Sequence, residues 1–89
     1  MQVFVERGII TKRRAGKDGK WVYLTVICGE NDECDFTYSA ADGVAETFSH
    51  VVPLQPVQIK ASVQGKIFVG EDGRRRQSLE IVQAQIEPV

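Results

Sequence analysis

The chain has 89 residues, of which 43% are hydrophobic and 26% are charged, and its formal net charge at pH 7 is −1. This length allows one core, so we expect a single domain over residues 1–89. The apolar content is too high for a disordered tail, and no apolar run approaches the roughly 18 residues that cross a bilayer. The N-terminal residues lack the basic start and cleavage-like segment of a signal peptide, so we expect a cytoplasmic protein.

Charge is distributed unevenly along the chain. Residues 7–20 contain six Lys or Arg and one Asp, and residues 29–50 contain six Asp or Glu and no Lys or Arg. Residues 74–76 are three consecutive arginines. An acidic segment between two basic ones can create local potentials that the net charge does not report.

The first predicted strand covers residues 2–14 and is rich in Val, Ile and Phe, as strands are. Gly8 lies in its middle, where a strand that serves two sheets of a small barrel must bend. Residues 15–20 form a turn by composition, with Asp-Gly as the strongest signal.

The second predicted strand, residues 21–28, is apolar or aromatic on both alternating faces near its start. One face carries the aliphatic set Val22, Leu24 and Val26 together with Cys28. Because that set suits a core, we expect Trp21 and Tyr23 on the other face to point outward or into a partner. The alternative is that both aromatics pack in the core or in a dimer seam.

The third predicted strand, residues 34–39, follows an acidic turn. Its alternation puts Phe36 and Tyr38 on one face and acidic or hydroxyl side chains on the other. This pattern leaves open whether the two aromatics are buried or exposed.

The period of two is lost over residues 40–50. Asp42 is a candidate N-cap for a short helix over Val44, Ala45 and Phe48, and an irregular loop is the alternative. His50 would then lie at the surface or at the helix end.

The last two predicted strands are residues 57–69 and 77–87. The former shows the clearest alternation of the chain, interrupted by Gly65, where we expect a second bend. Residues 70–76, which include the three arginines, are predicted to form the hairpin loop between the two strands.

The sequence offers no constellation of catalytic or cofactor-binding residues. Cys28, Cys34 and His50 are the only Cys and His side chains and fall short of the four ligands of a structural zinc. A disulfide across the short loop between the cysteines is possible, but a cytosolic setting favours free structural thiols. Phosphate loops, the calcium-loop spacing and a nucleophile elbow are absent. We therefore predict no enzyme activity, no cofactor and no metal.

Three strands, a short helix or loop, and two further strands form the order of an OB-type barrel. We therefore predict an all-β fold: a small five-stranded OB-like Greek-key barrel with a short helix or loop between strands 3 and 4. Residues 57–67 followed by residues 79–82 resemble the last hairpin of single-stranded-DNA-binding proteins. Residues 14–24, where basic and glycine residues precede an aromatic strand, resemble the first hairpin of the filamentous-phage helix-destabilising (gene V) proteins. The chain length also matches the phage family.

This resemblance implies a sequence-tolerant single-stranded-DNA-binding protein that acts in DNA replication, recombination or transfer. One small domain offers few contacts to each strand, so we expect a homodimer. Aromatic side chains would stack on bases and loop cations would hold phosphates. The acidic segment would then face away from the strand or mask the site when DNA is absent. The predicted nucleic-acid-binding residues are Lys12, Arg13, Arg14, Lys17, Lys20, Trp21, Tyr23, Arg74, Arg75 and Arg76.

Two other ligands stay open at this point. RNA is one, because nothing in the sequence reports on a 2′-hydroxyl group. The second alternative is an OB-like protein–protein interaction module that uses the acidic segment as its contact and binds no nucleic acid. No small-molecule substrate and no membrane are expected as partners.

Overall fold

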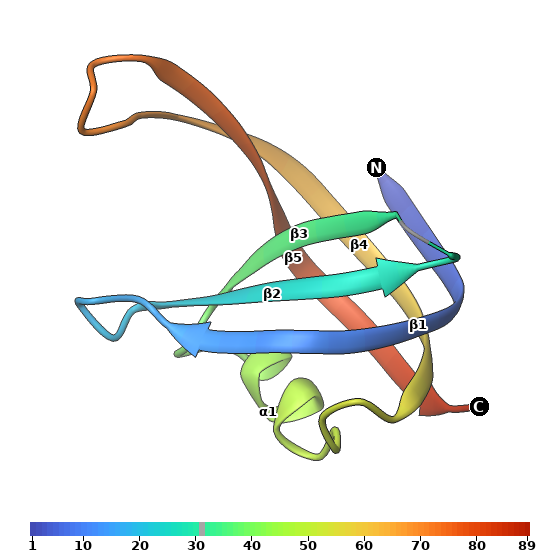
Figure 1. The fold of residues 1–89 in the computed structure, drawn as a ribbon. Helices are drawn as coiled ribbons and strands as arrows, with labels where there is room; N and C mark the ends of the chain where they lie inside the picture. Colours follow the sequence, from blue (N-terminus) through green and yellow to red (C-terminus); the bar gives the residue numbers. More distant parts are fainter. Residues whose placement is uncertain (31) are drawn as a thin grey trace.

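The computed structural model describes residues 1–30 and 32–89, and in this part of the chain five strands surround one core (Figure 1). The strands close a barrel in the order β1-β2-β3-β5-β4, in which β3 and β5 pair in parallel and the other neighbours pair antiparallel. This is the five-stranded OB-type order, so the predicted fold class is confirmed. The elements are β1 (Gln2–Ala15), β2 (Trp21–Cys28), β3 (Glu33–Ser39), α1 (Gly43–Ser49), β4 (Pro56–Val69) and β5 (Arg75–Pro88).

β1 closes the barrel because it pairs with two strands at once. Its first half pairs with β4 and its second half with β2, and the register shifts between Val5 and Gly8 and again between Ile10 and Lys12. A Cβ at Gly8 would lie 2.8 Å from a methyl group of Val5 and 2.9 Å from one of Val26. Glycine is therefore required where the strand changes partner, as predicted for this position.

Alternation along β2 and β3 separates a buried face from an open one. Leu24 and Val26 are almost fully buried, whereas Tyr23 on the opposite face of β2 is 40% exposed. Phe36 and Tyr38, which the sequence left undecided, are both buried in the core. Burial raises the pKa of the Tyr38 hydroxyl above its ordinary value. The two aromatics of β3 thus belong to the core and expose almost no ring surface.

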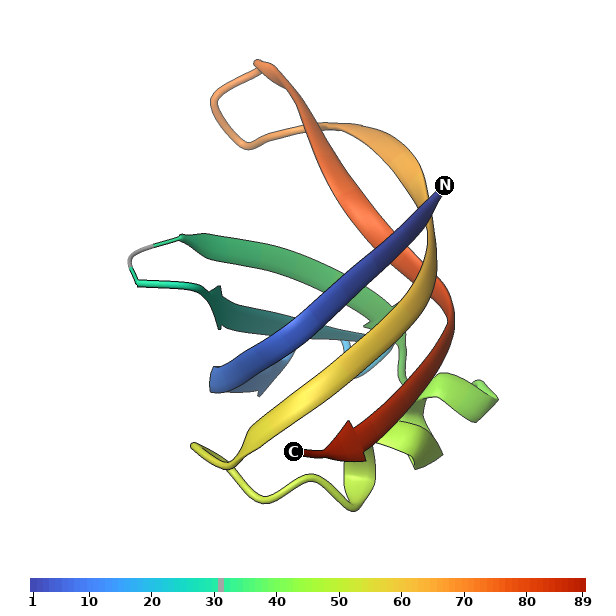
Figure 2. The same ribbon diagram turned by 90° about the vertical axis from the view of Figure 1, so that its right-hand side faces the viewer.

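The helix α1 covers one end of the barrel (Figure 2). The Asp42 carboxylate caps it by accepting a hydrogen bond of 2.9 Å from the Val44 amide, as predicted. Val44 and Phe48 are buried, and the Phe48 ring stacks on Tyr38 with 5.0 Å between ring centroids. His50 is exposed at the C-terminal end of the helix. In the described residues, no helix is long and apolar enough to span a membrane.

The β4–β5 hairpin is longer than predicted, and its distal part, residues 66–78, extends beyond the barrel (Figure 1). We call this part the arm. The turn closes through a 2.9 Å hydrogen bond from the Gly70 amide to the Arg74 carbonyl. Arg75 and Arg76 are therefore strand residues rather than loop residues, because they pair with Val69 and Phe68.

The bend predicted at Gly65 is not a break in the strand register. Pairing runs without interruption through Gly65 and Leu79, and the irregularity of this hairpin lies between Ser62 and Val63. The Gln77 side chain lies 2.8 Å from the position that a Cβ of Gly65 would occupy. The missing side chain thus leaves room for a cross-strand neighbour.

Candidate functional site

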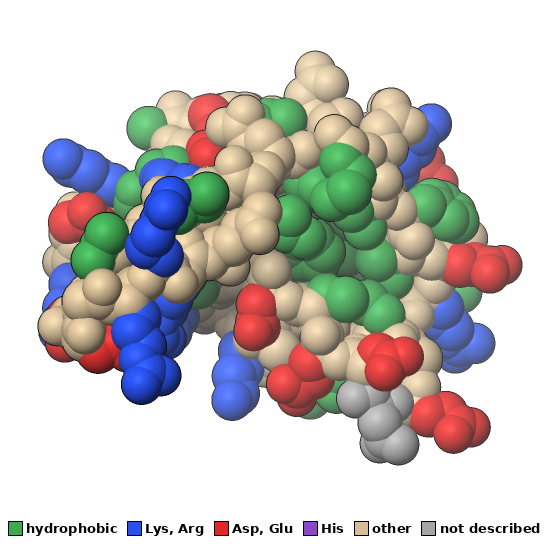
Figure 3. Space-filling view, turned by 90° about the horizontal axis from the view of Figure 1, so that it is seen from above, with side chains coloured by type: hydrophobic (Ala, Val, Ile, Leu, Met, Phe, Trp, Pro, Cys, Tyr) green, Lys and Arg blue, Asp and Glu red, His purple; other side chains and the backbone are tan. Residues whose placement is uncertain are grey.

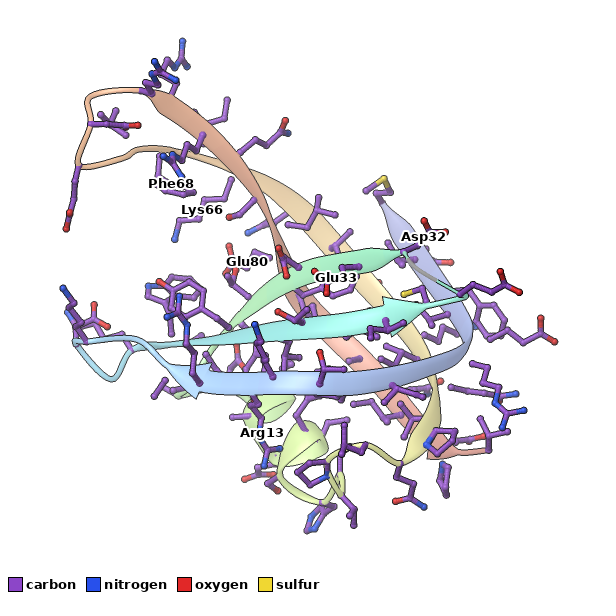
Figure 4. All side chains as sticks on the ribbon, viewed as in Figure 1. Arg13, Asp32, Glu33, Lys66, Phe68 and Glu80 are labelled. Atoms are coloured by element: carbon purple, nitrogen blue, oxygen red, sulfur yellow. The ribbon has the colours of Figure 1, made fainter. Side chains whose placement is uncertain are left out.

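An open groove of about 800 Å³ lies between the outer face of the β1–β2–β3 sheet and the arm. We call it the aromatic groove. Figure 4 shows Lys66 and Phe68 on the arm directed toward β2, and Figure 3 shows the hollowed surface from above. The groove is lined by Lys12, Arg14, Trp21, Tyr23, Leu24, Thr25, Asp35, Phe36, Thr37, Lys66, Phe68, Arg76 and Ser78.

The floor of the groove follows from the alternation along β2. Trp21, Tyr23 and Thr25 lie on the face opposite the buried Leu24 and Val26. The interpretation of Trp21 and Tyr23 as outward-facing is therefore correct. Trp21 is half-buried and Tyr23 is exposed, so each ring keeps surface that a planar ligand can cover.

Two cations stand over the two rings of β2. The Arg14 guanidinium carbon lies 5.4 Å from the Tyr23 ring centroid, and the Lys66 Nζ lies 3.7 Å from the Trp21 ring centroid. Such cation–π contacts contribute about 0.5–1 kcal/mol at exposed sites. The same ring faces are the surfaces on which another flat group would stack. The site therefore combines stacking surfaces with positive charges that can be displaced from them.

The arm contributes a third exposed aromatic ring, Phe68, and two of the four cations of the groove, Lys66 and Arg76. Antiparallel pairing sets Phe68 opposite Arg76 and Lys66 opposite Ser78, so that these four side chains lie on one face of the hairpin. Phe68 is 44% exposed. The arm thus forms a wall of the groove that is both apolar and basic.

Arg76 is held by a partner at the base of the arm's turn. Its guanidinium lies 3.1 Å from the Asp72 carboxylate. The backbone amide of Arg74, followed by Arg76, lowers the pKa of the Asp72 carboxyl. Exposed ion pairs of this kind contribute little to stability, so Arg76 can exchange Asp72 for another anion at small cost.

Five of the ten predicted binding residues line the aromatic groove: Lys12, Arg14, Trp21, Tyr23 and Arg76. The other five do not line it. Lys17, Lys20 and Arg74 lie exposed in or beside the two hairpin turns, and Arg75 pairs with Val69 on the other face of the arm. Arg13 points toward α1, where its guanidinium donates a hydrogen bond to the Phe48 carbonyl (Figure 4).

Lys66 and Phe68 line the aromatic groove but are not among the binding residues predicted from the sequence. Residues 67–69 form an unbroken apolar run, which hides the period of two. The signal that remained was the regular polar set at positions 58, 60, 62, 64 and 66, which places Lys66 and then Phe68 on the outer face of β4. That signal did not reveal that the arm faces β2.

The charges of the aromatic groove are mostly positive. Four cations line it, and Asp35 is its one carboxylate, held by a 3.0 Å hydrogen bond from the Thr25 hydroxyl. Asp32 and Glu33 lie at the opposite end of the β2–β3 hairpin from Trp21, as Figure 4 shows. These two carboxylates of the acidic segment therefore lie away from the groove, whereas Asp35 lies within it.

A second groove of about 610 Å³ lies beside α1 and has a different lining. We call it the glutamine groove. It contains one cation, Lys60, and no aromatic ring. Its lining residues are Gln2, Gly43, Val44, Thr47, Lys60, Ala61, Ser62, Val82, Gln83, Ala84 and Gln85. In residues 1–30 and 32–89, no group of three His, Cys, Asp or Glu side chains could hold a metal ion.

The fold resembles solved structures, whereas comparisons of the sequence gave no match. No protein-family model and no curated protein sequence matches the chain. Two crystal structures of the mitochondrial single-stranded DNA binding protein Rim1 from S. cerevisiae align with TM-scores of 0.59 and 0.55, the latter with selenomethionine-labelled protein. Each alignment has 11% identity and covers 99% of this chain and 95% of the Rim1 chain. Similarity at this identity supports the fold alone.

Proposed function

We propose that this chain binds single-stranded DNA, with little sequence preference, in the aromatic groove. The observation that carries the proposal is that one open groove joins Trp21, Tyr23 and Phe68 with four cations. Stacking of a base on an aromatic side chain contributes about 1–3 kcal/mol and does not depend on which base is present. Lys and Arg side chains beside such rings suit the phosphates between the stacked bases.

The proposed mechanism is an exchange of partners within the groove. In the free protein, Lys66 and Arg14 cover the rings of Trp21 and Tyr23. When DNA enters, bases take these ring faces and the two cations move to the neighbouring phosphates. Arg76 exchanges Asp72 for a phosphate in the same way. Duplex DNA hides its base faces in stacks, so the groove favours single strands and melts duplexes by mass action.

The similarity to Rim1 supports this proposal, because Rim1 is described as a single-stranded DNA binding protein and shares the barrel. We extend the proposal to replication, recombination or transfer of a genome in the cytoplasm. We also propose a homodimer, since one small domain offers few contacts to each strand. The likeness of residues 14–24 to the phage gene V proteins stays a prediction. The role proposed is binding, without catalysis.

The test is a titration of the protein with oligo-dT, followed by the fluorescence of Trp21, which is the only tryptophan. We expect quenching, and an affinity that falls as salt rises. If all four groove cations meet phosphates, the slope of log K against log salt is about −3, at about −0.7 for each phosphate.

A parallel titration with oligo-U of the same length compares RNA with DNA. Equal affinity for both would show that the groove does not distinguish a 2′-hydroxyl group. Absence of binding at low salt would contradict the proposal and favour the protein–protein interaction module.

A further inference from the structure

The two cysteines lie side by side at the end of the β2–β3 hairpin that is far from Trp21. Cys28 ends β2, and Cys34 follows the first residue of β3. Cys34 pairs with Val26, so the two cysteines are diagonal neighbours across the ladder. A 2.7 Å hydrogen bond from the Cys28 amide to the Asp32 carbonyl fixes the hairpin end between them. Two cysteines that are six positions apart in the sequence are therefore close together in space.

The two sulfur atoms are in van der Waals contact. Cys28 Sγ and Cys34 Sγ are 3.4 Å apart, and both residues are free thiols. A disulfide bond is about 2.05 Å long, so the sulfurs must approach by roughly 1.4 Å. Diagonal neighbours in a ladder are typically somewhat farther apart than the Cα atoms of a disulfide, so bond formation needs rotation of both side chains together with a small backbone movement at the hairpin end. The chain has no other cysteine that could compete for either thiol.

Small molecules can reach the pair. Cys28 and Cys34 line an open hollow of about 670 Å³ together with Val3, Phe4 and Arg7. Burial, followed by the neighbouring Cys34 and then Asp32, raises the pKa of the Cys28 thiol to about 11. Metal binding does not fit this site, because no third Cys, His, Asp or Glu of the described residues completes a cluster.

We propose that Cys28 and Cys34 form a redox modification site, at which a low-molecular-weight disulfide oxidises both thiols to one intramolecular disulfide. In the first step, one cysteine thiolate attacks the oxidant, forms a mixed disulfide and releases one small thiolate. In the second step, the other cysteine thiolate attacks the mixed disulfide and releases the second small thiolate. Two electrons pass to the oxidant, and the two protons given up by the cysteines protonate the released thiolates. The proposal is independent of DNA binding.

The test exposes the reduced protein to oxidised glutathione and follows it by mass spectrometry and thiol titration. We expect a product lighter than the reduced protein by two hydrogens, with both thiols lost together. The disulfide constrains the unfolded chain across the short hairpin loop, so the oxidised protein has a Tm higher by several degrees. Reduction with dithiothreitol restores the mass, both thiols and the original Tm.

The single variants Cys28→Ser and Cys34→Ser serve as controls, because each keeps one thiol at nearly unchanged volume. Each is expected to stop at a mixed disulfide with one glutathione. If the wild-type protein also accumulates glutathione adducts, forms disulfide-linked dimers, or keeps both thiols under conditions that modify the variants, the proposal is wrong.

Discussion

Lys60 and Lys66 lie on the same face of the same strand, yet they line different grooves. Both belong to the even-numbered, outward-facing set of β4. Lys60 lies in the glutamine groove beside α1, whereas Lys66 lies 3.7 Å above the ring of Trp21 in the aromatic groove. The difference arises because β4 is 14 residues long and twists past the barrel, so that its two ends face different neighbours.

This comparison shows that charge alone does not distinguish the two surfaces. The glutamine groove offers one cation and neutral amides, while the aromatic groove sets four cations among the accessible rings of Trp21, Tyr23 and Phe68. Only the second arrangement can stack bases and hold phosphates at the same time. Paired substitutions, one inside the aromatic groove and one outside it, therefore test whether this groove binds DNA.

The largest effect is expected for Trp21→Ala. Loss of one base stack, at about 1–3 kcal/mol, lowers the affinity for oligo-dT by about 5- to 150-fold. Fluorescence anisotropy of a labelled oligonucleotide measures the change. The matched control is Phe4→Ala, which removes an aromatic ring that is 64% exposed on β1 and outside the aromatic groove. Equal affinities of the two variants would contradict the role of the groove, provided that thermal melts show both are folded.

Arg14 and Arg13 are neighbours in the sequence but point to opposite sides of β1. Arg14→Ala removes the cation over Tyr23 and is expected to weaken DNA binding several-fold. Arg13→Ala removes the hydrogen bond to the Phe48 carbonyl, at a cost of about 1 kcal/mol in the free energy of unfolding. Its effect on DNA affinity is expected to be small. Anisotropy and thermal denaturation of both variants separate the two roles, and the reverse pattern would show that the placement of Arg13 is wrong.

The pair Lys66→Ala and Lys60→Ala tests the two ends of β4 directly. Lys66→Ala is expected to reduce the salt slope of oligo-dT binding by about 0.7, because one phosphate contact is lost. Lys60→Ala removes the same charge from the other groove and should leave the slope unchanged. The measurement is the affinity at four or more salt concentrations. A smaller slope in both variants would mean that DNA also crosses the glutamine groove.

The smallest effect is expected for Asp35→Asn. This change removes the one carboxylate of the aromatic groove and retains a side chain that can accept the hydrogen bond from Thr25. We expect the affinity for DNA to rise by about twofold, since one exposed like-charge repulsion is small in water. Glu46→Gln on α1 is the control, because it also removes one negative charge but at a position outside the aromatic groove. A loss of affinity in the Asp35 variant would indicate that the carboxylate contacts a base.

Local sequence patterns predicted the parts of this fold that depend on neighbouring residues. The alternation in β2 correctly separated the buried Leu24 and Val26 from the outward Trp21 and Tyr23. Asp42 correctly marked the start of α1, because capping acts within one helical turn. Gly8 correctly marked the irregularity of β1, where the register with β4 shifts between Val5 and Gly8.

Which side chains line the aromatic groove depends on contacts between residues that are far apart in the sequence, and local patterns do not predict such contacts. The register shift between Ile10 and Lys12 decides which of the adjacent arginines faces β2, and no composition signal marks it. Lys66 and Phe68 reach the site because the twist of a long hairpin carries them over β2. Patterns with a period of two predict the side of a strand, but they do not predict which distant strand that side will face.

Amide chemical-shift changes in ¹⁵N-labelled protein, followed during titration with a short oligo-dT, locate the bound strand on the protein surface. We expect the largest changes on residues 12–14, 21–25, 35–37, 66–68 and 76–78, around the aromatic groove. Changes concentrated instead around Lys60, Ser62 and Gln83 would place DNA in the glutamine groove and show that the aromatic groove is not the binding site.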